Sequence, residues 1–257
     1  ELADQAWLPL EAARLPEARL LLARAFERFG NEARDQYAPS IDGVFEAGLR
    51  NVARDLDEWL TRMLEEHAFV PRYFELAFGL RRGERDEHSV PEPVKLPIGV
   101  TLIGAIDLVE QDRSGALRAT DFKTSRVPET LGVVDGGRTL QPLLYALALE
   151  QLFPGQKVAS GRLYYCTARG DYRSHEVPLD DSTRALGRSV IAAMDRMLAA
   201  GFLPAAPAQL PEDRERNECE RCSYRAVCGP YELERSSVIK QRDHGRLEPL
   251  FQLRGMR

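Results

Sequence analysis

The segment Gly104–Arg126, with the sequence GAIDLVEQDRSGALRATDFKTSR, decides the fold of this chain. Two apolar runs flank the turn-forming residues 112–115, DRSG, which predicts a β-hairpin. Each run also carries an aspartate, at Asp107 and Asp121, and Lys123 follows two residues after the second one. An ordinary hairpin gains no stability from two carboxylates in its apolar part, so their placement needs a chemical explanation.

The spacing of these polar residues predicts a single cluster. Side chains alternate between the two faces of a strand, so Asp121 and Lys123 share a face and Phe122 points the other way. If positions 110 and 118 pair across the turn, Asp107 falls opposite Asp121; a slip of one residue would break this arrangement. Facing carboxylates repel each other, and a divalent cation such as Mg²⁺ would remove the repulsion. The alternative is that both aspartates are solvated and that the triplet Asp121-x-Lys123 arose by chance.

Composition places the chain among ordinary globular proteins. It has 257 residues, of which 44% are apolar and 29% charged, enough for a substantial core. The sequence shows neither an apolar run long enough to span a membrane nor a signal peptide, so we expect a cytoplasmic protein without membrane contact. A net charge of -5 is a mild argument against a protein that coats nucleic acid without sequence preference, because such proteins are usually basic. Because the chain starts with Glu1, we expect it to be a fragment of a longer protein.

Hydrophobic periodicity predicts helices on both sides of a central run of strands. Such an order is typical of a mixed α/β sheet flanked by helices, with an N-terminal helical layer. We therefore divide the chain into an N-terminal helical region (1–70), a core (71–204) and a C-terminal segment with a cysteine cluster and a charged tail (205–257). The expected helices are 9–29, 40–66, 139–153 and 180–201, and the expected strands are 71–83, 95–111 with an interruption near Pro97 and Gly99, 116–125, and two within 160–179.

Three short motifs follow one another in the central part of the chain. They are Gly104-x-x-Asp107, then Asp121-Phe122-Lys123, then Gln141-x-x-x-Tyr145, in which the last two residues share a helical face. Each motif is weak alone, but the ordered set resembles the RecB-like branch of the PD-(D/E)XK nuclease superfamily.

The resemblance implies a fold and an activity. It predicts a restriction-endonuclease-like α/β core that hydrolyses DNA with Mg²⁺ or Mn²⁺, as in the nuclease domain of AddB-type proteins. It also implies exonuclease action in double-strand-break repair or recombination, with a helicase partner subunit or a fused helicase-like region. Two alternatives stay open, namely an inactive nuclease fold that binds DNA as a scaffold and a CRISPR-associated RecB-like nuclease.

Residue roles are carried over position by position. Asp107 and Asp121 resemble metal ligands, the Phe122 carbonyl resembles a third ligand, and Lys123 resembles the catalytic lysine. The helical motif shapes the site and contacts DNA in the family, which gives Gln141 and Tyr145 that expected role. Glu75 resembles an acidic position before the hairpin, and an ordinary structural carboxylate is an equal explanation.

One expected element of the family is missing. A histidine on a helix before the hairpin usually adds a metal ligand, but neither His67 nor His88 lies in a matching motif. Glu46 is a weaker candidate, since its segment also reads as an ordinary amphipathic helix. We expect the missing ligand upstream of Glu1, or lost, and its loss would favour the inactive scaffold.

The cysteines form a second candidate metal site. Cys219-x2-Cys222-x5-Cys228 has a spacing that favours metal binding over disulfides when no export signal is present. Thiolates bind zinc or iron–sulfur clusters, usually in fours. The resemblance implies a [4Fe–4S] cluster whose fourth cysteine precedes the core. Cys166 is the one remaining cysteine and is better explained as a buried thiol; zinc and three metal-free thiols remain alternatives.

Overall fold

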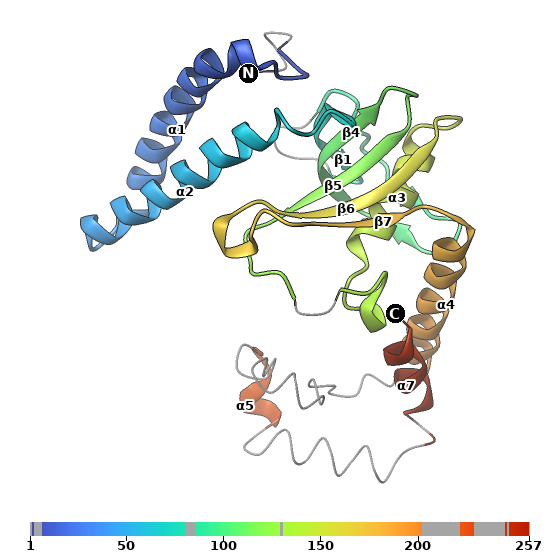
Figure 1. Ribbon diagram of the computed structural model, residues 1–257. Coiled ribbons are helices and arrows are strands. Elements are labelled where there is room, and N and C mark those ends of the chain that lie inside the picture. The colour runs from blue at the N-terminus through green and yellow to red at the C-terminus, as the bar shows by residue number, and fades with distance from the viewer. Residues whose placement is uncertain are drawn as a thin grey trace.

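The fold is built on one mixed five-stranded sheet (Figure 1). The computed structural model describes residues 2, 7–80, 86–128, 131–201, 222–228, 245 and 247–256. Strand order is β1-β4-β5-β6-β7; only β5 and β6 run parallel, and α3 connects them. The strands are β1 Phe69–Phe78, β4 Gly104–Asp112, β5 Leu117–Lys123, β6 Val158–Tyr165 and β7 Ser174–Pro178.

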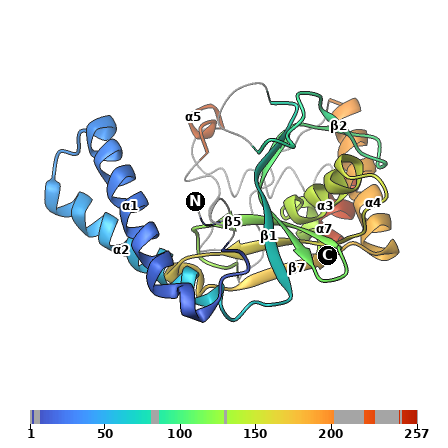
Figure 2. The ribbon, with the colours of Figure 1, turned by 90° about the horizontal axis from the view of Figure 1, so that it is seen from above.

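Helices lie on both sides of this sheet, which confirms the predicted mixed α/β architecture (Figure 2). The main core lies between the sheet and α3, α4 and α7, with Phe78, Ile106, Leu147 and Val190 fully buried in it. The helix α3 has an apolar surface almost all round, as expected for a helix packed against a sheet on one side and other helices on the other. The helices are α1 Leu15–Tyr37, α2 Asp42–Arg62, α3 Gln141–Leu152, α4 Asp181–Ala199, α5 Arg225–Cys228 and α7 Glu248–Gly255. Among the described residues, no helix is both long and apolar enough to cross a membrane.

The strands β4 and β5 pair in the register that the sequence analysis assumed. Glu110 pairs with Arg118 across the turn, and Leu108 pairs with Thr120. Asp112 accepts hydrogen bonds from the backbone N–H groups of Ser114 and Ala116, which closes the turn. Glu110 and Arg118 also form a buried, bidentate ion pair at 2.9 and 3.0 Å. A slip of one residue would leave both of these charges buried without a partner, so the pair fixes the register.

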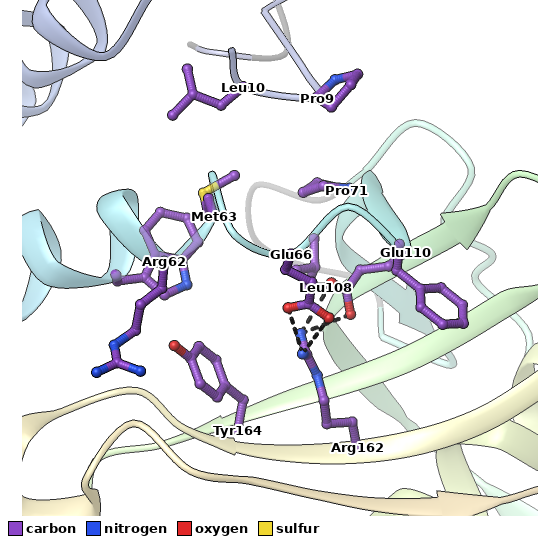
Figure 3. A pocket seen from close by; sticks show the side chains of 12 residues that line it. Pro9, Leu10, Arg62, Met63, Glu66, Pro71, Leu108, Glu110, Arg162 and Tyr164 are labelled. Carbon is purple, nitrogen blue, oxygen red and sulfur yellow. Dashed lines mark hydrogen bonds and ion pairs between the residues drawn. The ribbon is translucent and has the colours of Figure 1, made fainter. Parts of the chain in front are cut away.

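A buried polar network continues from this ion pair across the face of the sheet opposite α3. Arg162 donates to both carboxylate oxygens of Glu110 at 3.0 Å and to Thr120 Oγ1 at 3.0 Å. Glu66, which follows α2, accepts from both Arg118 and Arg162. Figure 3 shows Arg162 pointing from β6 towards Glu66 at the edge of a small cavity of about 40 Å³. The network therefore joins the end of α2 to the sheet.

The N-terminal helices form a pair that extends away from the sheet (Figure 1). Their small core contains Leu10, Ala18 and Leu60, close to the sheet. The apolar side chains of α2 are buried only at that end, because Val44 is 67% exposed and Val52 is 49% exposed.

Several expected boundaries are also corrected. The interruption near Pro97 and Gly99 is a separate two-stranded hairpin of β2 (Val94–Lys95) and β3 (Thr101–Leu102), and the strand proper starts at Gly104. Gly99 has φ 89°, which glycine adopts without strain. Part of the C-terminal tail, which the sequence analysis described only as charged, forms α7. Its leucines at helical spacing, Leu247, Leu250 and Leu253, are buried in the core.

A glycine in β6 sets the position of α3. A Cβ on Gly161 would lie 1.8 Å from the carbonyl oxygen of Pro142, in the first turn of α3, far inside van der Waals contact. The absence of a side chain therefore lets the start of α3 touch the sheet.

Substituting Gly161→Ala should destabilise the protein by about 3 kcal/mol, because neither the strand nor the helix start has space to move. Urea denaturation would measure the change. Gly48→Ala is the matched control, since nothing lies within 4 Å of a Cβ at that helical glycine and alanine favours helix. Equal stabilities of the two variants would contradict the close approach.

The network also predicts a pH dependence. Burial would raise the pKa of Glu66, but Arg162 and Arg118 outweigh it and hold the pKa below its usual 4.5. The stabilisation by Glu66 is thus fully present above pH 4.5 and is lost as the pH falls through the lowered pKa. Glu66→Gln should cost about 1 kcal/mol at neutral pH, a modest value because the Glu66 side chain is 38% exposed and water screens it.

Thermal unfolding of wild type and Glu66→Gln across pH 2–7 would test this pH dependence, with the two proteins converging at the acid end. The exposed neighbour Glu65 provides the control variant, Glu65→Gln, which should change little. A Glu66→Gln deficit that does not depend on pH would contradict the ion pairing.

Candidate functional site

Two carboxylates lie side by side on neighbouring strands at one end of the sheet. The paired residues of β4 and β5 run up to Leu108 and Thr120, and the next position brings Asp107 beside Asp121. Asp107 is half-buried and Asp121 is only 6% exposed. The Asp107 carboxylate accepts a hydrogen bond of 2.7 Å from the backbone N–H of Phe122, which fixes its orientation towards β5.

Asp121, Lys123 and Gln141 form a closed triangle of contacts. The Lys123 ammonium lies 2.6 Å from Asp121 Oδ2 and donates to Gln141 Oε1 at 2.7 Å. The other end of the Gln141 amide donates from Nε2 to Asp121 Oδ1 at 3.0 Å. Asp121 Oδ2 contacts the ammonium but accepts no well-directed hydrogen bond from the described residues. One glutamine therefore holds both the lysine and the aspartate, and leaves one buried carboxylate oxygen incompletely bonded.

The first residue of α3 reaches this triangle because of the chain path. Lys123 ends β5, and α3 starts at Gln141 beside the same end of the sheet. Tyr145 lies one turn further along α3, where its ring would be 3.8 Å from a Cβ on Gly104. Phe78 lies at 3.5 Å from the same point, so a side chain at position 104 would crowd both rings. The glycine of the first motif thus makes room for the tyrosine of the third.

Glu75 lies across from Asp107 on the neighbouring strand. The flanking pairs Phe74–Leu108 and Leu76–Ile106 place it there. Its backbone has φ 52°, a conformation that non-glycine residues rarely adopt within a strand. Strained backbone of this kind is concentrated at functional sites. Position 75 of β1 therefore faces position 107 of β4.

The electrostatics show that these groups share one environment. Burial raises the pKa of the Asp121 carboxyl above its usual range; the Lys123 ammonium opposes this rise, and the Asp107 charge adds to it. Burial also raises the pKa of the Tyr145 phenol, and the charges of Asp121, Asp107 and Glu75 raise it further. Tyr145 therefore stays protonated near neutral pH and can donate a hydrogen bond.

The donor set at this site suits a hard cation such as Mg²⁺ or Mn²⁺. Such ions prefer carboxylate and carbonyl oxygens and keep several waters, so two carboxylates are sufficient. Within the described parts of the chain, no group of three or more His, Cys, Asp or Glu side chains is arranged to hold a metal ion. The available ligands are thus Asp107, the incompletely bonded Oδ2 of Asp121 and the Phe122 carbonyl expected from the sequence.

The remaining upstream candidates lie apart from this cluster. Glu46 is paired with Arg34 of α1 within the helical pair. His88 contacts Asp86 at 2.9 Å and packs against the Tyr73 ring at 4.8 Å. His67 is exposed. None of these contacts joins a candidate for the missing histidine to the carboxylates.

The cysteine cluster is only partly described. Cys222 is exposed, Cys228 ends the short helix α5, and Cys219 lies outside the described residues. Cys166 is half-buried after β6, where its backbone N–H donates to the Lys123 carbonyl at 3.0 Å. Burial raises the pKa of the Cys166 thiol, which favours an unreactive thiol over a ligand.

Two structural supports of the site were missed in the sequence. Arg162 stabilises Thr120, the neighbour of Asp121, from the opposite face of the sheet. The signal was a lone arginine in the apolar run SGRLYY, 160–165. Gly161, in the same run, allows the approach of α3 that brings Gln141 to Asp121.

Comparisons with known proteins identify a family for this chain. The model of the PD-(D/E)XK nuclease superfamily matches residues 2–229. A curated relative from Symbiobacterium thermophilum, named as a subunit of an ATP-dependent helicase/deoxyribonuclease, is 36% identical over 126 residues. That match covers 45% of this chain and 11% of the relative, so the chain spans a small part of the relative's length. The mixed sheet flanked by helices is consistent with a restriction-endonuclease-like fold, and the chain belongs to the PD-(D/E)XK nuclease superfamily.

Proposed function

We propose that this chain is a metal-dependent DNA nuclease that hydrolyses phosphodiester bonds at the Asp107–Asp121–Lys123 cluster. The observation that carries the proposal is the contact triangle of Asp121, Lys123 and Gln141 beside a second carboxylate. A buried, negatively charged pair is costly unless a cation offsets it. Family membership and the helicase/deoxyribonuclease relative support a nuclease role.

The side chains divide the work of hydrolysis. Asp107, Asp121 and the Phe122 carbonyl would hold Mg²⁺ or Mn²⁺, which when bound supplies positive charge and polarises the phosphate. Lys123 holds the attacking water or donates to a phosphate oxygen as negative charge develops. The water oxygen bonds to phosphorus while the bond to the leaving oxygen breaks, and that oxygen takes up a proton. Gln141 keeps Lys123 and Asp121 in place, and the protonated Tyr145 can donate to the DNA backbone.

The finer assignments rest on the resemblance and on the relative's name. We propose exonuclease action in double-strand-break repair or recombination, together with a helicase partner or helicase-like region, in the cytoplasm. We also propose that Cys219, Cys222 and Cys228 bind a [4Fe–4S] cluster, for which this chain shows no fourth ligand of matching spacing. Glu75 is proposed as a further acidic residue of the site, since the flanking strand pairs place it across from Asp107 and its charge acts on Tyr145.

One observation favours the rival, an inactive DNA-binding scaffold. No third acidic or histidine side chain joins the two aspartates as a metal-binding group in the described parts of the chain. Activity and metal binding therefore need separate tests.

A cleavage assay on end-labelled DNA tests the activity. With Mg²⁺ or Mn²⁺ the wild type should cut, whereas Lys123→Ala and Asp107→Asn should reduce the rate by about 100-fold or more, because each removes a group acting in the transition state. Lys95→Ala and Asp195→Asn are matched controls at exposed positions. Cleavage that survives in EDTA, or in both site variants, would reject the assignment.

Thermal unfolding with added Mn²⁺ tests metal binding without any turnover. A ligand that binds only the folded state raises Tm. At a ligand concentration of 100 times Kd, it adds about 2.7 kcal/mol to the free energy of unfolding. Wild type and Lys123→Ala should both gain stability with Mn²⁺, while Asp107→Asn should gain much less. Stabilisation without cleavage would support the scaffold, and the absence of any Mn²⁺ effect on wild type would contradict the metal site.

A further inference from the structure

A second cavity lies beside the candidate active site, on the same face of the sheet. It has a volume of about 270 Å³ and is lined by Pro128 and Leu131 from the loop after β5 and by Tyr165, Arg173, Ser174 and His175 from the ends of β6 and β7. An apolar cavity of about 150 Å³ already holds benzene, so this space is large enough for a planar ring with polar edges.

The strand register places this cavity next to Lys123. Lys123 pairs with Tyr165 across β5 and β6, and the Tyr165 N–H donates to the Arg173 carbonyl at 2.9 Å. One step back along the strands, Asp121 pairs with Leu163, and Leu163 pairs with His175. Paired residues share a face, so the row of Asp121 continues to His175. Two strand spacings separate Asp121 from His175, on the order of 10 Å.

His175, which lines this cavity, has a polar atom that lacks a partner. The Nε2 atom of His175 is buried and has no hydrogen bond within the described part of the chain. A nitrogen of a neutral imidazole ring donates or accepts a hydrogen bond according to the tautomer. Burial lowers the pKa of His175, so the ring stays neutral near pH 7.

Arg173 adds a positive charge to the lining of the same cavity. The Arg173 side chain is exposed and makes no ion pair with the described residues. A guanidinium group is suited to bidentate contact with a phosphate. The lining of the cavity thus includes an imidazole with an unpartnered nitrogen, a guanidinium suited to anions, and apolar side chains of the loop. A nucleotide has the complementary chemistry, because its base carries N–H donors and its backbone carries phosphate.

We propose that this cavity is a subsite for an unpaired nucleotide that flanks the scissile phosphate, with its base inside against His175 and its phosphate at Arg173. The base must be unpaired, since its N–H donors on the Watson–Crick edge are otherwise engaged in the duplex. The subsite would favour single-stranded DNA, or frayed ends, over intact duplex. The inference rests on the proposed nuclease function, because the active site defines which phosphate the nucleotide flanks.

The test uses single-stranded oligonucleotides in which one abasic position is moved along the strand past the cleavage site. For the wild type, KM should rise roughly tenfold when the abasic position enters the subsite, as expected for loss of one base contact. His175→Ala should remove this sensitivity, and His175→Gln should keep part of it because the amide retains an acceptor. Arg173→Ala should raise KM several-fold at every position with little change in kcat, as expected for a phosphate contact.

Arg169→Ala and His67→Ala are the matched controls, since both residues are exposed and lie outside the cavity lining. Fluorescence anisotropy in EDTA measures binding of the same oligonucleotides without cleavage, and Arg173→Ala keeps the test valid if His175→Ala fails to fold. Wild-type cleavage without a sensitive position, together with unchanged binding by Arg173→Ala, would overturn the subsite alone. An absence of cleavage would count against the nuclease function, while the binding data would still decide the subsite.

Discussion

The register between β4 and β5 is the constraint on which the rest of the site depends. It brings Asp107 beside Asp121 on one face and Glu110 beside Arg118 on the other. Removing one partner of such a buried ion pair typically costs about 3–5 kcal/mol, so a slipped strand pairing would be strongly disfavoured. The pair that fixes the register thus lies on the opposite face from the carboxylates and does not compete with them for a cation.

The candidate active site itself contributes little stability in the absence of metal. Asp121 is buried next to a like charge, and its pKa is raised although Lys123 contacts it. The structure compensates in part, through the Phe122 N–H on Asp107 and the Gln141 amide on Asp121. A binding site for a cation and a phosphate needs such incompletely satisfied groups. A ligand gains binding energy only from groups that the protein itself has not already paired.

Local patterns predicted more of this site than of the structure around it. Strand alternation and the turn placed Asp107, Asp121 and Lys123 on one face, and helical spacing placed Gln141 and Tyr145 together. The parallel pairing of β5 and β6 could not be predicted in the same way, because it joins segments separated by a whole helix. The contact of Arg162 with Thr120, the approach of Pro142 to Gly161 and the positive φ of Glu75 all depend on such non-local packing.

Phe122 connects the two faces of the sheet. Its backbone N–H binds Asp107 on the candidate active-site face, while its ring meets Trp59 of α2 edge-on, with a centroid distance of 6.3 Å, on the other. The same end of α2 continues to Glu66, whose contacts with Arg118 and Arg162 join it to β5 and β6. A displacement of the α1–α2 pair would therefore move Phe122, and with it the backbone that carries Asp121 and Lys123. The helical pair is in a position to affect the candidate site without contacting the substrate, because a single residue of the D-F-K motif packs against the helix and orients a carboxylate.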